Sequence, residues 1–118
     1  MPAYNAERTL EKTYSSIPQN IIDEIIIVDD GSKDRTLEVA RTLNAYVVAH
    51  SDNKGYGANQ KMCYALALER KADCIVMIHP DYQYDGRLIP VAVEVVALGI
   101  CDVVLGNRIR TRRECLAC

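Results

Sequence analysis

The chain has 118 residues, of which 49% are hydrophobic and 25% charged, as expected of one ordinary globular domain over residues 1–118. Its formal net charge of -2 gives no electrostatic reason to expect nucleic-acid binding. No apolar run approaches the ~20 residues of a transmembrane helix, and residues 1–5 do not have the character of a signal peptide.

Short apolar runs and longer amphipathic stretches alternate along the chain. The first stretch carries Leu10, Tyr14 and Ile17 at helical spacing, and the run that follows it, 24–28, is rich in β-branched residues. An apolar run of this length is typical of a strand buried on both faces. The strands predicted in this way are 24–28, 45–49 and 74–78, with 102–105 as a weaker copy.

Further amphipathic stretches predict helices between and after these strands. The shared faces carry Leu37, Ala40 and Leu43 in the second helix, Ala58, Met62, Ala65, Leu66 and Glu69 in the third, and Leu88, Ala92, Val95 and Val96 in the fourth. Ser32 and Asp85 signal helix starts. The alternation predicts an α/β fold in which helices flank a mostly parallel sheet.

Both ends of the sequence depart from the pattern of a complete parallel sheet. The chain opens on a turn with no predicted strand before it, and it closes on the arginine-rich stretch 108–113. A parallel sheet normally begins with a strand. We therefore expect the chain to be a piece of a longer protein.

The five cysteines form an odd and scattered set. Cys63, Cys74 and Cys101 lie in apolar stretches and are expected to be small buried hydrophobic residues. Cys115 and Cys118 have the spacing of a redox or metal-binding pair, but no second pair completes a zinc site. We expect reduced thiols in a cytoplasmic protein.

Polar residues follow each predicted strand. Ligands of open α/β sheets bind beyond the carboxyl ends of the strands, so one edge would gather several of these side chains. They are Asp29, Asp30, Asp52, His79 and Asp81. Because neighbouring carboxylates repel one another, the pattern favours a cation or a basic ligand among them.

Segment 79–83 is the best candidate for metal binding. Asp81 offers a carboxylate oxygen, Gln83 an amide oxygen and His79 an imidazole nitrogen. This mixture suits Mn²⁺ or Mg²⁺ completed by substrate phosphates better than a closed zinc site. The alternative is structural, with His79 ending a strand and Asp81 capping a turn.

Three other segments allow a structural and a functional interpretation. Residues 29–32 form either a turn with a helix cap or a nucleotide contact, in which Asp30 accepts hydrogen bonds from a nucleobase. Gly55 and Gly57 lack the third glycine of a dinucleotide fingerprint, so a flexible helix start is the default. The terminal arginines form either a solvated tail or a phosphate clamp.

Taken in order, these segments resemble the family 2 glycosyltransferases, and most closely their polyprenyl-phosphate and dolichyl-phosphate sugar transferase branch. Matching motifs cover essentially the whole chain. They are Pro2-Ala3-Tyr4-Asn5, the stretch 27–36 around Asp29-Asp30-Gly31-Ser32, the glycine-containing segment 53–58, His79-Pro80-Asp81-Tyr82-Gln83 in place of a D-x-D-x-Q metal motif, and Gly106-Asn107-Arg108.

The resemblance implies a GT-A fold, a Rossmann-like fold of nucleotide-sugar transferases, and a UDP- or GDP-linked sugar donor. His79, Asp81 and Gln83 would ligate Mn²⁺ or Mg²⁺, with Asp81 as the catalytic residue. The acceptor in relatives is often a polyprenyl phosphate, which would place the full-length enzyme at the cytoplasmic membrane face. The residues implied to contact the donor are Pro2, Ala3, Tyr4, Asn5, Asp29, Asp30, Gly31, Lys54, Gly55 and Arg108.

The sequence departs from the family pattern at four points. His79 replaces the first aspartate of the metal motif, and Ala6 stands where relatives often carry a glutamate, with Glu7 one place late. The family's first strand, which is central in the sheet, and its acceptor-side region do not appear in the sequence. We expect such a fragment to be weakly active or inactive.

Two other functions are compatible with the same residues. A phosphoacceptor signalling domain of the receiver type arranges an acidic pair and a single aspartate around Mg²⁺, and Asp29, Asp30 and Asp81 would fill these roles. Such a domain would not explain residues 2–5. A non-catalytic module would bind a UDP- or GDP-sugar without turning it over.

Overall fold

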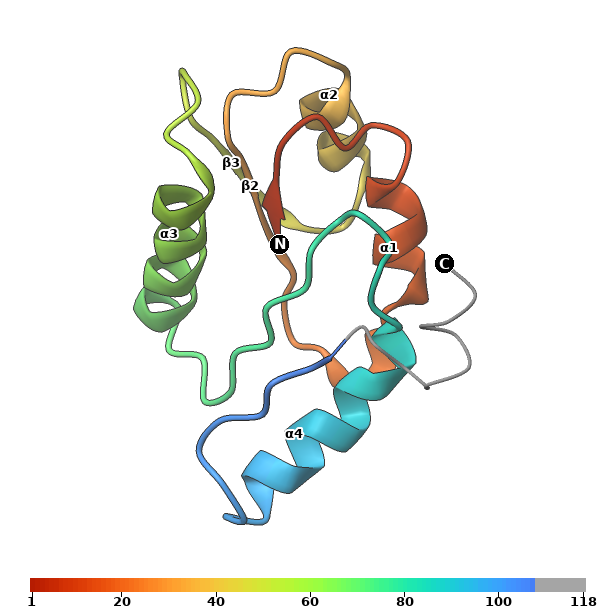
Figure 1. Ribbon diagram of the computed structural model, residues 1–118, viewed down its shortest axis with the longest axis vertical. Helices are drawn as coiled ribbons and strands as arrows, with labels where there is room; N and C mark the ends of the chain where they lie inside the picture. Colours follow the sequence, from red (N-terminus) through yellow and green to blue (C-terminus); the bar gives the residue numbers. More distant parts are fainter. Residues whose placement is uncertain (108–118) are drawn as a thin grey trace.

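The computed structural model describes residues 1–107, in which helices lie on both sides of a small parallel sheet (Figure 1). The strands are β1 (Pro2–Ala3), β2 (Ile26–Asp29) and β3 (Tyr46–Ala49). The α-helices are α1 (Leu10–Ser16), α2 (Thr36–Thr42), α3 (Tyr56–Glu69) and α4 (Ile89–Ala97), and the 3-10 helices are η1 (Gln19–Ile21) and η2 (Gly86–Leu88). The predicted α/β class with a parallel sheet is confirmed.

The strands lie in the order β1-β2-β3 and all run parallel. Strand β2 is central, and its apolar residues Ile27 and Val28 are completely buried, as expected for a strand covered on both faces. Its last residue, Asp29, is level with Ala3 on one side and Ala49 on the other. The carboxyl ends of the strands therefore share one edge of the sheet.

Strand β1 corrects the expectation that no strand precedes the first helix. It pairs with Val28 and Asp29, and the amino group of Met1 donates a 2.7 Å hydrogen bond to the Ile26 carbonyl. Burial lowers the pKa of this amino group, because desolvation disfavours its charged form. A strand of two residues is too short to show the alternation from which strands are predicted.

Helix α3 covers one face of the sheet, and α1 and α2 lie on the other (Figure 1). The buried face of α3 consists of Asn59, Cys63 and Ala67, at four-residue spacing. The face predicted for this helix was wrong, and Met62 on it is exposed. Apolar residues occur on all sides of α3, so their pattern did not single out the face that meets the sheet.

One of the two predicted helix starts is confirmed. Asp85 accepts a 3.0 Å hydrogen bond from the backbone N–H of Arg87 at the start of η2. The other was wrong, because α2 begins at Thr36 and the Ser32 hydroxyl donates to Asp29 instead. Both residues have the polar side chain of a helix cap, and only the surrounding loops decide which backbone group it meets.

The predicted strands 74–78 and 102–105 are not strands in the part of the chain that the structure describes. Segment 74–78 packs Ile78 into the hydrophobic core but leaves Val76 exposed. The neighbouring β1 offers only two residues, and Pro2 has no N–H to donate. The apolar run therefore lacks a backbone partner with which it can form a ladder.

A cavity of about 460 Å³ separates segment 74–78 from β2. Its lining is largely apolar. It includes Ile26 of β2, Ile75 of segment 74–78, Met1 at the start of the chain and Ala67 of α3. Segment 74–78 is thus partly buried without being paired.

The described cysteines differ in burial. Cys63 is buried as predicted, and burial raises the pKa of its thiol. Cys74 is exposed, contrary to the prediction, because its segment is not built into the sheet, and Cys101 is half-buried. Cys115 and Cys118 lie outside the described residues. Among residues 1–107 no helix has both the length and the apolar character needed to cross a membrane.

Candidate functional site

Six of the predicted site residues lie in loops at the carboxyl ends of the strands. These loops are 4–9 after β1, 30–35 after β2 and 50–55 after β3, and we refer to them together as the rim. The aligned strand ends bring the three loops together at the edge where open α/β sheets bind ligands. The rim contains Tyr4, Asn5, Asp30, Gly31, Lys54 and Gly55, and it directly follows Ala3, Asp29 and Ala49.

Asn5 joins the first two loops of the rim. Its backbone N–H donates to the Ser32 hydroxyl over 2.9 Å, and its side-chain oxygen accepts the Lys33 N–H over 2.9 Å. Its φ of 49° is left-handed, a conformation that asparagine tolerates better than most residues. Tyr4 beside it is 46% exposed, whereas β1 is buried. Of the opening motif, Tyr4 and Asn5 are therefore the side chains accessible to a ligand.

Asp29 and Asp30 are both only 2% exposed, and hydrogen bonds from within the chain hold their carboxylates. Asp29 accepts the backbone N–H of Ser32 over 3.1 Å and its hydroxyl over 2.5 Å. Asp30 accepts the Lys54 N–H over 2.8 Å and the Gly55 N–H over 2.9 Å. Buried carboxylates need hydrogen-bond donors or a cation nearby, and here backbone N–H groups and a hydroxyl meet that need.

Two glycines give these loops left-handed backbone conformations, and at Gly31 the packing is also close. Gly31 has a φ of 67°, and a Cβ at this position would lie 2.8 Å from the backbone carbonyl carbon of Asp52. Gly55 has a φ of 89°, which side chains rarely allow. The close approach at Gly31 is therefore to loop 50–55, and its contact with a nucleotide stays a prediction.

Lys54 carries the exposed positive charge of the third rim loop. Its Nζ lies 2.7 Å from Asp52, and hydrogen bonds from Lys54 and Ser51 lower the pKa of the Asp52 carboxyl group. Exposed ion pairs of this kind contribute little to stability. The ammonium group can therefore exchange Asp52 for an anionic ligand at the rim.

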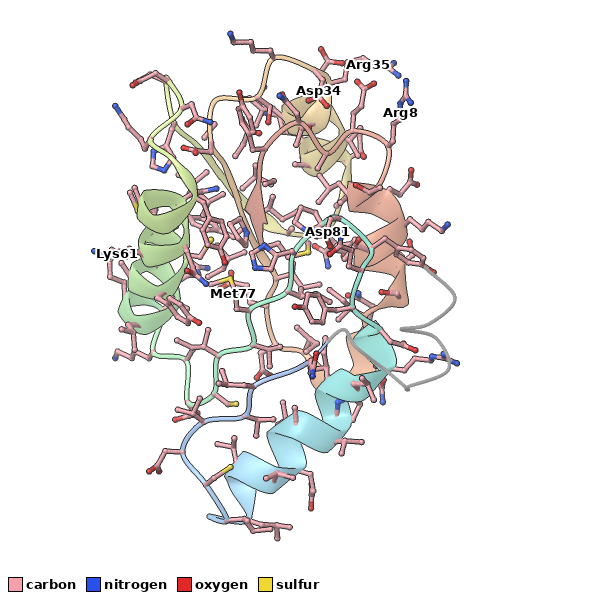
Figure 2. The ribbon with its side chains drawn as sticks, in the orientation of Figure 1. Arg8, Asp34, Arg35, Lys61, Met77 and Asp81 are labelled. Carbon is pink, nitrogen blue, oxygen red and sulfur yellow. The ribbon has the colours of Figure 1, made fainter. Side chains whose placement is uncertain are left out.

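Sequence reasoning missed three side chains that hold the rim together, namely Glu7, Asp34 and Thr36. The buried Thr36 hydroxyl accepts the Ala6 N–H over 2.6 Å and donates to Asp34 over 2.5 Å. Asp34 also accepts the Glu7 N–H over 3.2 Å, and Glu7 accepts the Arg35 N–H over 3.0 Å. Figure 2 shows Asp34 and Arg35 together at this end of the molecule.

For Asp34, one of these three residues, the sequence did contain a signal of its hydrogen bonding. Desolvation opposes its ionisation, but hydrogen bonds from Thr36 and from backbone N–H groups outweigh this and hold the pKa of Asp34 below its ordinary value. An aspartate two residues before a helix start commonly accepts a local N–H, as Asp34 does from Thr36 over 2.9 Å. The bonds to Ala6 and Glu7, in contrast, cross between loops and have no local signature.

The predicted metal segment, 79–83, meets the start of α3, directly after the third rim loop, through His79. Nε2 of His79 lies 3.2 Å from the hydroxyl of Tyr56, the first residue of α3, and the two ring centroids are 5.3 Å apart. Asp81 is exposed, and its Oδ1 accepts the Gln83 N–H over 3.0 Å in a local turn. Figure 2 shows Asp81 on the loop that leads towards η2.

Helix α1 supports the same loop from the other side. The ammonium group of Lys12 lies 4.4 Å from the centroid of the Tyr82 ring, a cation–π contact. Tyr82 has a φ of 59°, an unusual conformation for an aromatic residue. The turn that carries Asp81 is thus held at His79, two residues before Asp81, and at Tyr82, the residue after it.

The residues of segment 79–83 fit a divalent cation in the kind of atoms they offer. They supply one exposed carboxylate, an imidazole and an amide, a mixture that suits an open site completed by phosphate oxygens. Within residues 1–107, no three His, Cys, Asp or Glu side chains come together in a way that could hold a metal ion. A cation at this site would therefore need the phosphates of a ligand. Arg108, the predicted phosphate contact, lies outside the described residues.

The chain is similar to curated archaeal proteins. It is 30% identical to the UDP-N-acetylglucosamine--dolichyl-phosphate N-acetylglucosaminyltransferase of Methanococcus voltae, over 97% of this chain and 52% of that protein. It is also 30% identical to the dolichol-phosphate mannosyltransferase of Pyrococcus furiosus, over 92% of this chain and 32% of that protein. The chain thus spans about half of the first relative and a third of the second. No solved structure matches it.

The sequence profile described as Glycosyl transferase family 2 matches residues 1–116. The match includes all three rim loops and segment 79–83. It therefore covers both the described sheet and the residues that carried the resemblance. The chain belongs to glycosyl transferase family 2.

Proposed function

We propose that the chain is the donor-binding part of a metal-dependent glycosyltransferase. It would hold a UDP- or GDP-linked sugar for transfer to an acceptor such as a polyprenyl phosphate. The observation that carries the proposal is the rim, a set of hydrogen-bonded loops at the carboxyl ends of parallel strands, with His79 of the Asp81 segment in contact with Tyr56 directly after the third loop. Family membership and the dolichyl-phosphate relatives support it.

The proposed roles follow from burial and hydrogen bonding. Tyr4 and Asn5 contact the nucleotide with their exposed side chains, and Lys54 faces the diphosphate with its ammonium group. Pro2, Ala3, Asp29, Asp30, Gly31 and Gly55 form the floor of the site and hold its loops in register. Arg108 would add a further phosphate contact.

The metal ligands in this proposal are His79, Asp81 and Gln83, together with phosphate oxygens of the donor. Bound Mn²⁺ or Mg²⁺ would stabilise the negative charge that develops on the leaving nucleoside diphosphate. Asp81 has an exposed carboxylate in a local turn, so it is open to a ligand. A lipid-phosphate acceptor would bring the full-length enzyme to the cytoplasmic membrane face.

The phosphoacceptor alternative is less compatible with the rim. A receiver-type domain needs an acidic pair that is open to Mg²⁺, whereas Asp29 and Asp30 are buried and engaged by Ser32, Lys54 and Gly55. The non-catalytic module differs from the proposal only in turnover. We expect little or no sugar transfer by the 118-residue chain alone, and rapid transfer would contradict that expectation.

The test is calorimetric titration of UDP and GDP into the 118-residue chain, each with and without Mn²⁺. We expect one of the two nucleotides to bind only in the presence of Mn²⁺. The variant Asp81→Ala should lose this binding, because it removes the charged metal ligand. Asp73→Ala is the matched control, since Asp73 is also exposed but lies at the opposite end of segment 74–78.

The outcomes separate the interpretations. Metal-dependent binding that is lost in Asp81→Ala and kept in Asp73→Ala supports the donor site. Binding that does not depend on Mn²⁺ and survives in Asp81→Ala would remove the metal from the proposal. If a folded chain binds neither nucleotide but Asp81 is labelled by acetyl phosphate, the phosphoacceptor function replaces it.

A further inference from the structure

We infer that Tyr56 is a positioning residue that orients the His79 ring, so that His79 presents Nδ1 rather than Nε2 to the cation and diphosphate. The inference rests on the proposed function and deepens it. Nothing in the sequence motifs assigns a role to Tyr56. The juxtaposition of its hydroxyl with the His79 ring, 23 residues away in the chain, suggests one.

The geometry of the pair is that of a specific contact. The Tyr56 hydroxyl lies 3.2 Å from Nε2, and the ring centroids are 5.3 Å apart with an interplanar angle of 32°. Tyr56 is 61% exposed, so burial does not hold its ring in place. The phenol therefore meets the metal segment at His79, through the hydrogen bond and the ring contact.

The hydrogen bond at one imidazole nitrogen decides whether the other nitrogen carries a proton or a lone pair that can bind a metal. If Nε2–H donates to the phenol oxygen, Nδ1 carries the lone pair and is available as a metal ligand. The Tyr56 hydroxyl keeps its own proton and remains free to donate to a phosphate oxygen. Tyr56 would thus select both the tautomer and the direction of the His79 ring.

The phenol stands on a part of the chain that is fixed to the sheet. Asp30 holds the N–H groups of Lys54 and Gly55 immediately before α3. One turn into the helix, the buried Asn59 side chain donates a 3.0 Å hydrogen bond to the Val28 carbonyl. Tyr56 lies between these two attachments, one to the loop after β2 and one to β2 itself, so it can transmit the position of the rim to His79.

The first test needs no metal. Long-range ¹H–¹⁵N spectra in mildly alkaline buffer distinguish a protonated from an unprotonated ring nitrogen. In the wild-type chain we expect His79 to be protonated at Nε2 and unprotonated at Nδ1. Tyr56→Phe should shift both signals towards a mixture of tautomers, whereas Tyr64→Phe, on the same helix, should leave them unchanged.

The second test is titration of Mn²⁺ in the presence of the nucleotide that binds. Loss of a residue that orients a ligand weakens metal affinity about 10-fold or more, and we expect this for Tyr56→Phe but not for Tyr64→Phe. If Tyr56→Phe changes neither the ring signals nor the affinity of a wild-type chain that binds Mn²⁺, the inference is wrong and the donor site stands. The inference is equally wrong if Tyr56→Phe changes the ¹⁵N signals of the His79 ring but leaves the affinity for Mn²⁺ unchanged.

Failure of the proposed function gives a different result. A wild-type chain that binds no Mn²⁺ with either UDP or GDP overturns the metal site of the proposed function, and the role of His79 as a ligand falls with it. Tyr56 is exposed and Tyr56→Phe removes a single oxygen atom, so the variant should fold. The thermal unfolding curves of wild type and both variants provide the check.

Discussion

The region from β1 to β3 and the region that follows α3 are held in place by different interactions. In the first, parallel backbone ladders join the strands and side chains from the strand ends tie the loops together. In the second, local turns and packing predominate, as where a Cβ on Gly86 would lie 2.6 Å from the Ser16 carbonyl oxygen. An apolar run therefore becomes a strand only beside a backbone that can pair with it.

The surfaces of the two regions differ accordingly. Ile27 and Val28 of β2 are fully buried, whereas Ile100 and Val103 are each 69% exposed. Hydrophobic composition alone therefore does not place a residue in the core. Contact with a neighbouring element decides it, and the region after α3 has fewer such neighbours among the described residues.

The largest expected effect comes from one substitution made in both regions. Ile27→Ala removes a fully buried side chain from the central strand and should lower the free energy of unfolding by about 2–5 kcal/mol. Ile100→Ala should change it by no more than about 0.5 kcal/mol, because its side chain is already in water. Denaturant unfolding of both variants checks this, and similar losses at both sites would abolish the distinction.

A smaller effect is expected when the rim is opened. Asp30→Ala leaves the N–H groups of Lys54 and Gly55 without their acceptor and should reduce stability by about 1–3 kcal/mol. Asp52→Ala, in the loop of Lys54 and Gly55, removes only an exposed ion pair and should have little effect on stability. Thermal unfolding measures both, and a near-neutral Asp30→Ala would show that side-chain bonds do not hold the rim.

Amide hydrogen exchange tests the comparison without any substitution. The amides of β2 should be protected to nearly the full free energy of unfolding, because the strand is paired on both sides. The amides of 75–78 should exchange at rates close to those of an unstructured peptide, since no ladder holds them. Strong protection of 75–78 would mean that this segment is paired after all.

Local patterns anticipated much of the fold. The apolar runs 24–28 and 45–49 predicted β2 and β3, because a short β-branched run between polar turns has few other stable arrangements. The same reasoning placed Asp30 and Lys54 at one edge, since the carboxyl ends of parallel strands must align. It failed for 74–78, where the local pattern is as strong but the partner is two residues long.

The sequence by itself determined the α/β class, the edge of the sheet that carries the polar loops and the family to which the chain belongs. These properties follow from hydrophobic periodicity and from motifs that are contiguous in the chain. The packing of the elements decided that Asp30 joins the second and third rim loops, that Thr36 joins the first two and that Tyr56 meets His79. Each of these contacts joins residues more than 20 positions apart, so it depends on how the elements pack and not on the pattern within any one of them.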